Sequence, residues 1–196
     1  MNLREGAIAG VVQLGLAGAA ATLGGALGGR ADAVSVGGFV AVGALAVALE
    51  VGAQRADDAV VDDETMRWLA QATSVGVFLL LVGGAVELAW RGGARVPQEV
   101  APLVIACSGS ALRALAIHTL GPAFRSGLAI PETGLSSRGP YRVLRHPSEV
   151  GLWLLSAGML IASPGVATLS GACVVIVSSL WRIRLEDAFL RSARAQ

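Results

Sequence analysis

The chain has 196 residues, of which 54% are hydrophobic and 15% are charged, whereas about 25% of residues are charged in typical soluble domains. Its net charge of +1 shows no basic footprint for nucleic acid. Both cysteines, Cys107 and Cys173, lie inside apolar runs, which argues against a disulfide framework and against a metal site. The apolar residues are grouped into long uncharged runs, as in an integral membrane protein.

Four apolar runs in the first part of the chain are long enough to be membrane helices, which need about 20 such residues. They are residues 7–27, 34–49, 68–90 and 100–120. Arg4 precedes the first run, which is too long for a signal peptide and is interpreted as a retained span. Trp68 and Trp90 end the third run, where amphipathic rings suit the two membrane interfaces.

A polar segment, residues 121–149, follows these runs, and its prolines and glycines exclude one continuous helix. Two shorter apolar runs, 150–162 and 166–181, are separated by Ser163-Pro164-Gly165, which predicts a helical hairpin. A polar tail, 182–196, can continue as a helix. The predicted fold is all-α: a polytopic membrane helical bundle with four long spans, a C-terminal helical hairpin and a short cytosolic helix. Residues 1–120 and 121–196 are expected to form one integrated membrane domain.

The distribution of arginine orients the chain. With the N-terminus inside, the inner loops and tail hold eleven arginines and the outer loops hold three, and Arg113 lies within a span. The inner ones are Arg4, Arg55, Arg67, Arg125, Arg138, Arg142, Arg145, Arg182, Arg184, Arg191 and Arg194, and the outer ones are Arg30, Arg91 and Arg95. The positive-inside rule favours this orientation, which places the 121–149 segment and the tail on one face.

Other features of the N-terminal part are weaker signals. Gly24 and Gly28, four residues apart, suit close helix packing and permit a homodimer without requiring one. The acidic residues between Asp57 and Glu64 are interpreted as a solvated loop, so no metal site is expected. Glu50 and Glu87, near span ends, are expected to reach water or a partner.

The densest polar motif is G-P-Y-R-V-L-R-H-P-S-E-V-G at 139–151, and R-I-R-L-E-D at 182–187 follows the hairpin. One interpretation is an interfacial anchor in which Arg142 and Arg145 bind lipid phosphate. The other is a site for a small zwitterion, whose carboxylate would bind arginine and whose ammonium would bind Glu186 or Asp187. The residues alone leave both open.

The spacing G-P-Y-x-x-x-R-H-P-x-x-x-G, an apolar hairpin and then R-x-R-x-E-[ED]-x-x-L resembles the isoprenylcysteine carboxyl methyltransferase and phospholipid methyltransferase superfamily. The resemblance covers roughly residues 112–190. It implies S-adenosylmethionine as methyl donor, bound on the cytosolic side, and an acceptor that enters from the bilayer. It also implies cofactor-binding roles for Tyr141, Arg145, His146, Pro147, Gly151, Glu186 and Asp187, with Glu186 holding the methionine ammonium.

The implied reaction is in-line methyl transfer, in which orientation and exclusion of water can supply roughly 7–11 kcal/mol. A carboxylate acceptor would need no base and would be steered by Arg182 or Arg113. An alcohol, phenol, thiol or amine would lose its proton to His146, Glu149 or His118.

Two of these candidates stand out. Glu149 stands where the family usually has tyrosine, which points to an unusual substrate. Arg113 lies inside a span, where a buried ion is costly. It is expected either to contact the substrate or to form an ion pair with Glu149 or Asp187.

The sequence is compatible with two other functions. Membrane sterol reductases resemble the superfamily and share an R-H-P turn, but they use NADPH; the acidic pair after the hairpin favours the methyl donor. A non-enzymatic membrane protein of the same fold is the other. The expected location is the inner membrane of a bacterium, among membrane lipids, with the active site facing the cytosol.

Overall fold

The computed structural model describes residues 33–53, 64–91, 96–120 and 138–194, together with Val11, Gly15 and Gly18. Within these residues every regular element is helical. The elements are α2 (Ala33–Ala53), α3 (Glu64–Phe78), the π-helical segment η1 (Leu79–Gly83), α4 (Gly84–Arg91), α5 (Val96–Leu120), the 3₁₀ turn η3 (Gly139–Arg142), α6 (Pro147–Ala162) and α7 (Val166–Arg194). Most of the first apolar run, the 24–28 glycine pair, the acidic residues 57–63 and the Glu50 side chain lie outside the described residues.

Three helical stretches of the described chain are long and apolar enough to cross a membrane: Trp68–Trp90, Val100–Leu120 and Val166–Ser192. The first two confirm the predicted third and fourth runs. Trp68 and Trp90 are both 60% exposed, as suits residues at the membrane interfaces. The apolar stretches Val36–Ala48 and Pro147–Ala162 are shorter.

The predicted hairpin is present, since α6 and α7 are joined by a turn at Ser163, Pro164 and Gly165. α6 begins at Pro147 rather than at residue 150, because proline is favourable in the first position of a helix. α7 continues without a break to Arg194. The polar tail is therefore the end of α7 and not a separate short helix.

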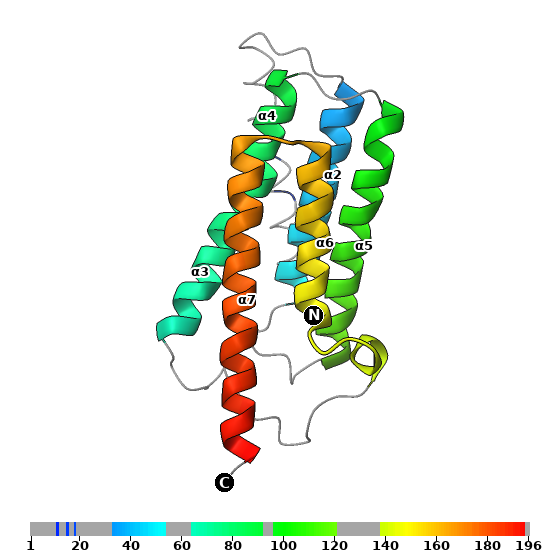
Figure 1. Ribbon diagram of the computed structural model, residues 1–196. Helices are drawn as coiled ribbons and strands as arrows, with labels where there is room; N and C mark the ends of the chain where they lie inside the picture. The colour runs from blue at the N-terminus through cyan, green and yellow to red at the C-terminus, as the bar shows by residue number, and fades with distance from the viewer. Residues whose placement is uncertain are drawn as a thin grey trace.

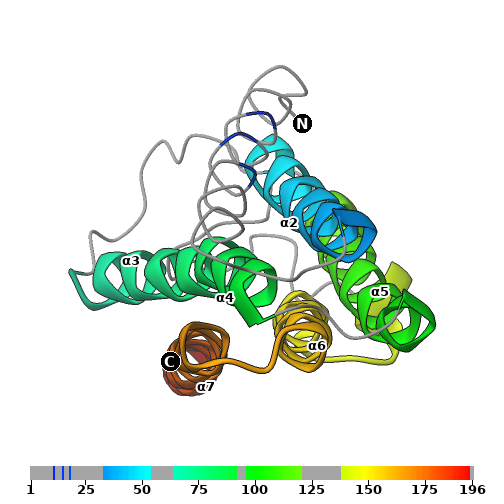
Figure 2. The ribbon, with the colours of Figure 1, turned by 90° about the horizontal axis from the view of Figure 1, so that it is seen from above.

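α6 lies between α7 and α5, with α3 and α4 beside α7 and α2 beside α5 (Figures 1 and 2). Phe39, Leu80, Met159 and Val175 belong to the buried apolar core between these helices. α5 and α6 approach each other closely. A Cβ at Gly151 would lie 2.6 Å from the carbonyl oxygen of Gly109 and 2.8 Å from the backbone nitrogen of Arg113. This contact fixes Arg113 against the start of α6.

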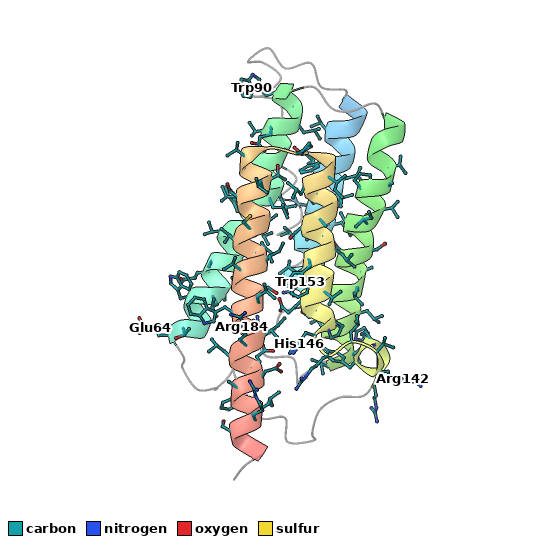
Figure 3. All side chains as sticks on the ribbon, in the orientation of Figure 1. Glu64, Trp90, Arg142, His146, Trp153 and Arg184 are labelled. Atoms are coloured by element: carbon teal, nitrogen blue, oxygen red, sulfur yellow. The ribbon has the colours of Figure 1, made fainter. Side chains whose placement is uncertain are left out.

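Glu87 in α4 holds the first turn of α7. Its carboxylate accepts hydrogen bonds from the backbone N–H groups of Ala167 at 2.8 Å and Thr168 at 3.2 Å, and from the Thr168 hydroxyl at 2.8 Å. The first N–H groups of a helix lack partners within it and favour an acidic group. Of the two predicted possibilities for Glu87, water or a partner, the structure shows a partner. This contact is at the same end of the molecule as Trp90, opposite His146 (Figure 3).

Candidate active site

The loop before α6 is folded against the end of α5. Gly139 has a φ of +53°, a conformation that strains other residues, and a Cβ there would lie 2.9 Å from Oγ1 of Thr119. The backbone N–H of Leu144 donates to the carbonyl of Pro140 at 3.0 Å. The loop then leads to His146, which occupies the N-cap position of α6 without a side-chain capping hydrogen bond.

Polar side chains form facing stripes on α6 and α7. His146, Glu149 and Trp153 are three and four residues apart, as are Ser179, Arg182 and Glu186 on α7, and residues at this spacing share one helix face. His146 and Trp153 lie on the side of α6 that faces α7 (Figure 3). The hairpin therefore brings the two predicted motifs together.

The outer polar cluster lies where α6 begins, and it comprises Arg145, His146, Arg182, Glu186 and Asp187. Nε of Arg182 donates to Oε1 of Glu186 at 2.9 Å. Nδ1 of His146 lies 3.6 Å from Oε2 of Glu186, and its Nε2 lies 3.5 Å from Oδ1 of Asp187. Nη2 of Arg145 lies 3.4 Å from the same Asp187 oxygen. All five residues were predicted from the sequence as site residues.

Two atoms of this cluster are buried without a hydrogen bond: Nε2 of His146 and Oδ1 of Asp187. These two atoms lie at ion-pair distance from each other, and the Asp187 oxygen lies at ion-pair distance from Arg145, but none of these contacts is a hydrogen bond. Leaving a buried polar atom unpaired costs about 1–3 kcal/mol. A ligand that carries both donors and acceptors would satisfy these atoms.

The inner network adjoins this cluster, and it comprises Arg113 of α5 with Ser148, Glu149, Trp153 and Ser179 of the hairpin. Nη1 of Arg113 donates to the Ser148 hydroxyl at 2.6 Å and lies 3.8 Å from Oε1 of Glu149. The Ser179 hydroxyl donates to Oε2 of Glu149 at 2.5 Å and accepts from Nε1 of Trp153 at 2.9 Å. Of the alternatives expected for Arg113, the structure shows the ion pair with Glu149, which joins α5 to the hairpin.

Trp153 and Ser179 were not predicted as site residues. Both lie in apolar runs whose hydropathy gives no sign of a site. The one available signal was their helical spacing from Glu149 and Glu186, which becomes informative only when the register of the hairpin is known.

Tyr141 lies within electrostatic reach of both groups. Burial raises the pKa of Tyr141 to about 12, and the negative charges of Glu186 and Glu149 contribute in the same direction, whereas Arg113 partly offsets them. The Tyr141 phenol is therefore close enough to both groups of residues for their charges to affect its pKa.

Four residues singled out in the sequence analysis belong neither to the outer polar cluster nor to the inner network. Pro147 is buried in the first turn of α6, and the missing side chain of Gly151 is explained by its contact with α5, so cofactor roles for both stay predictions. His118 is exposed in the last turn of α5. Arg142 is exposed and lies on the outer side of the loop, away from α7 (Figure 3).

The comparisons with known proteins bear on the same part of the chain. Residues 102–192 match the model of the isoprenylcysteine carboxyl methyltransferase (ICMT) family. This part of the chain is similar to the ICMT family. The ICMT match spans nearly all of α5, the whole hairpin and both polar groups, so it supports a membrane methyltransferase. It also crosses the predicted division at residue 120. Neither the search of curated proteins nor that of solved structures found a match.

Proposed function

We propose that the protein is an integral membrane methyltransferase that transfers a methyl group from S-adenosylmethionine to a lipophilic acceptor. The family match and the apolar helices support the general class. The observation that carries the cofactor is the outer polar cluster, where both signs of charge meet beside two buried atoms without hydrogen bonds.

The residues of the outer polar cluster fit the methionine end of the cofactor. An ammonium group has donors for the carboxylates of Glu186 and Asp187, and a carboxylate has acceptors for Arg145 and for an N–H of His146. Tyr141 would support the remaining part of the molecule. When bound, S-adenosylmethionine supplies a methyl group that is activated by its sulfonium charge.

The contribution of the chain is to hold the two reactants and to exclude water. The Arg113 and Glu149 side chains are 12% and 9% exposed, so the inner network is screened from solvent. Orientation in such a site can supply roughly 7–11 kcal/mol of the barrier.

The same proposal includes the location. The arginine distribution favours a cytosolic position for the outer polar cluster, and we place the protein in the bacterial cytoplasmic membrane. The acceptor enters from the bilayer, among the membrane lipids. Homodimer formation through the glycine-rich N-terminal run remains a prediction outside the described residues.

Calorimetry in detergent tests this function against its alternatives. The methyltransferase proposal predicts heat of binding for S-adenosylhomocysteine, the product of the methyl donor, and none for NADPH. Binding of NADPH alone would favour a reductase of the sterol type. Binding of neither would contradict both enzyme functions and leave a non-enzymatic membrane protein.

A further inference from the structure

We propose that the methyl acceptor is a neutral group with a proton on its reacting atom, a hydroxyl, thiol or amine, and that Glu149 accepts this proton. The inference rests on the proposed methyltransferase function and deepens it by naming the class of acceptor.

The arginines that would steer a carboxylate acceptor are already paired. Arg113 donates to both oxygens of Ser148, at 2.6 and 3.2 Å, and forms the ion pair with Glu149. Arg182 donates to Glu186 at 2.9 Å. An anionic acceptor would have to displace Glu149 from Arg113 or Glu186 from Arg182. The displaced carboxylate would stay nearby and repel the acceptor, because both are negatively charged.

Glu149 is held as a proton acceptor would be. Its Oε2 accepts from Ser179, whose hydroxyl is in turn fixed by the Trp153 N–H. Within the described part of the chain Oε1 accepts no hydrogen bond, since Arg113 stays at 3.8 Å. Arg113 balances the charge, so the buried pair is neutral overall. One carboxylate oxygen is therefore oriented and still has its lone pairs.

The position of Glu149 also suits the reaction. Ser179, which binds it, shares one face of α7 with Arg182 and Glu186 of the outer polar cluster. A methyl donor held at Glu186 and an acceptor held at Glu149 would thus lie along the same side of the hairpin.

The proposed step balances as follows. The acceptor atom forms a bond to the methyl carbon, and the bond between carbon and sulfur breaks with its electron pair going to sulfur. The sulfonium becomes a neutral thioether. The proton of the acceptor atom passes to Oε1 of Glu149 and leaves to water after product release.

The first test identifies the acceptor class without knowing the acceptor. Purified protein is incubated with methyl-labelled S-adenosylmethionine and a membrane lipid extract, and the product is treated with mild alkali. Ethers, thioethers and methylamines keep the label, whereas methyl esters release it as volatile methanol. The inference predicts label that stays non-volatile. Release of most of the label as methanol would overturn it, even if the protein binds S-adenosylhomocysteine as proposed.

The second test uses Glu149→Gln, which keeps the shape and the hydrogen bond from Ser179. We expect the turnover rate to fall about 100-fold or more, the usual contribution of a general base, with the affinity for S-adenosylhomocysteine within twofold of the wild type. A rate equal to the wild type would overturn the role of Glu149.

Ser179→Ala serves as a second variant if Glu149→Gln does not fold. It frees the carboxylate from its orientation, so the turnover rate is expected to fall while affinity for S-adenosylhomocysteine is kept. An unchanged rate would contradict the proposed orientation of Glu149. A wild-type protein that binds S-adenosylhomocysteine but labels nothing would overturn this inference together with the transfer reaction.

Discussion

Oε1 of Glu149 on α6 lies 3.8 Å from Nη1 of Arg113 on α5, and both side chains are largely buried. Removing one member of a buried ion pair leaves an uncompensated charge and costs about 3–5 kcal/mol, whereas replacing both by apolar residues is often neutral. We therefore expect Arg113→Met to lower the thermal midpoint followed by circular dichroism. The double variant Arg113→Met/Glu149→Met should recover most of the loss. A double variant less stable than the single one would show that Arg113 and Glu149 do not act on stability mainly through their mutual ion pair.

The crossing of α5 and α6 leaves no room for a side chain at Gly151, where a Cβ would lie 2.6 Å from the Gly109 carbonyl oxygen. We expect Gly151→Ala to destabilise the protein by about 1–3 kcal/mol, as overpacking usually does. Gly37→Ala in α2 is the control, since its Cβ would meet nothing within 4 Å. Equal thermal midpoints for the two variants would show that α5 and α6 are not packed this closely.

The hydrogen bonds from the first turn of α7 to the Glu87 carboxylate, which we call the Glu87 clamp, predict a stability effect far from the site. Glu87→Gln replaces one accepting oxygen by a donor that faces the N–H groups of Ala167 and Thr168. The expected loss is about 1–3 kcal/mol, the cost of buried polar groups left unpaired. Glu64→Gln is the matched control, because this carboxylate is exposed at the start of α3. A thermal midpoint lowered no more than in the control would argue against the clamp.

Tyr141 gives a direct spectroscopic signal because it is the single tyrosine of the chain. Its pKa of about 12 predicts that phenolate absorbance appears only at a pH well above 10, the approximate midpoint of an ordinary tyrosine. Between these values the unfolded chain loses the phenol proton first, so stability is retained below pH 10 and falls as pH rises toward 12. Glu186→Gln should lower the midpoint, since it removes a negative charge. A midpoint near 10 in the folded protein would place Tyr141 in solvent.

The helices that end in interfacial tryptophans or at a Pro-Gly turn could be predicted from the sequence, because those residues mark boundaries by their own chemistry. The outer polar cluster followed from a family motif at fixed spacing. The Gly109–Gly151 contact, the Glu87 clamp and the Trp153–Ser179 hydrogen bond did not follow. Each depends on how α5, α6 or α7 is rotated against its neighbour, and the hydropathy of these three helices differs little from one face to another.

Methyl transfer itself tests the central claim most directly. Purified wild-type protein, with methyl-labelled S-adenosylmethionine and a membrane lipid extract, should move label into the lipid fraction in proportion to time and protein. Glu186→Gln should lose this transfer through weaker cofactor binding, and Glu64→Gln should keep it. Label in the lipid fraction no higher than in a sample without protein would contradict the account.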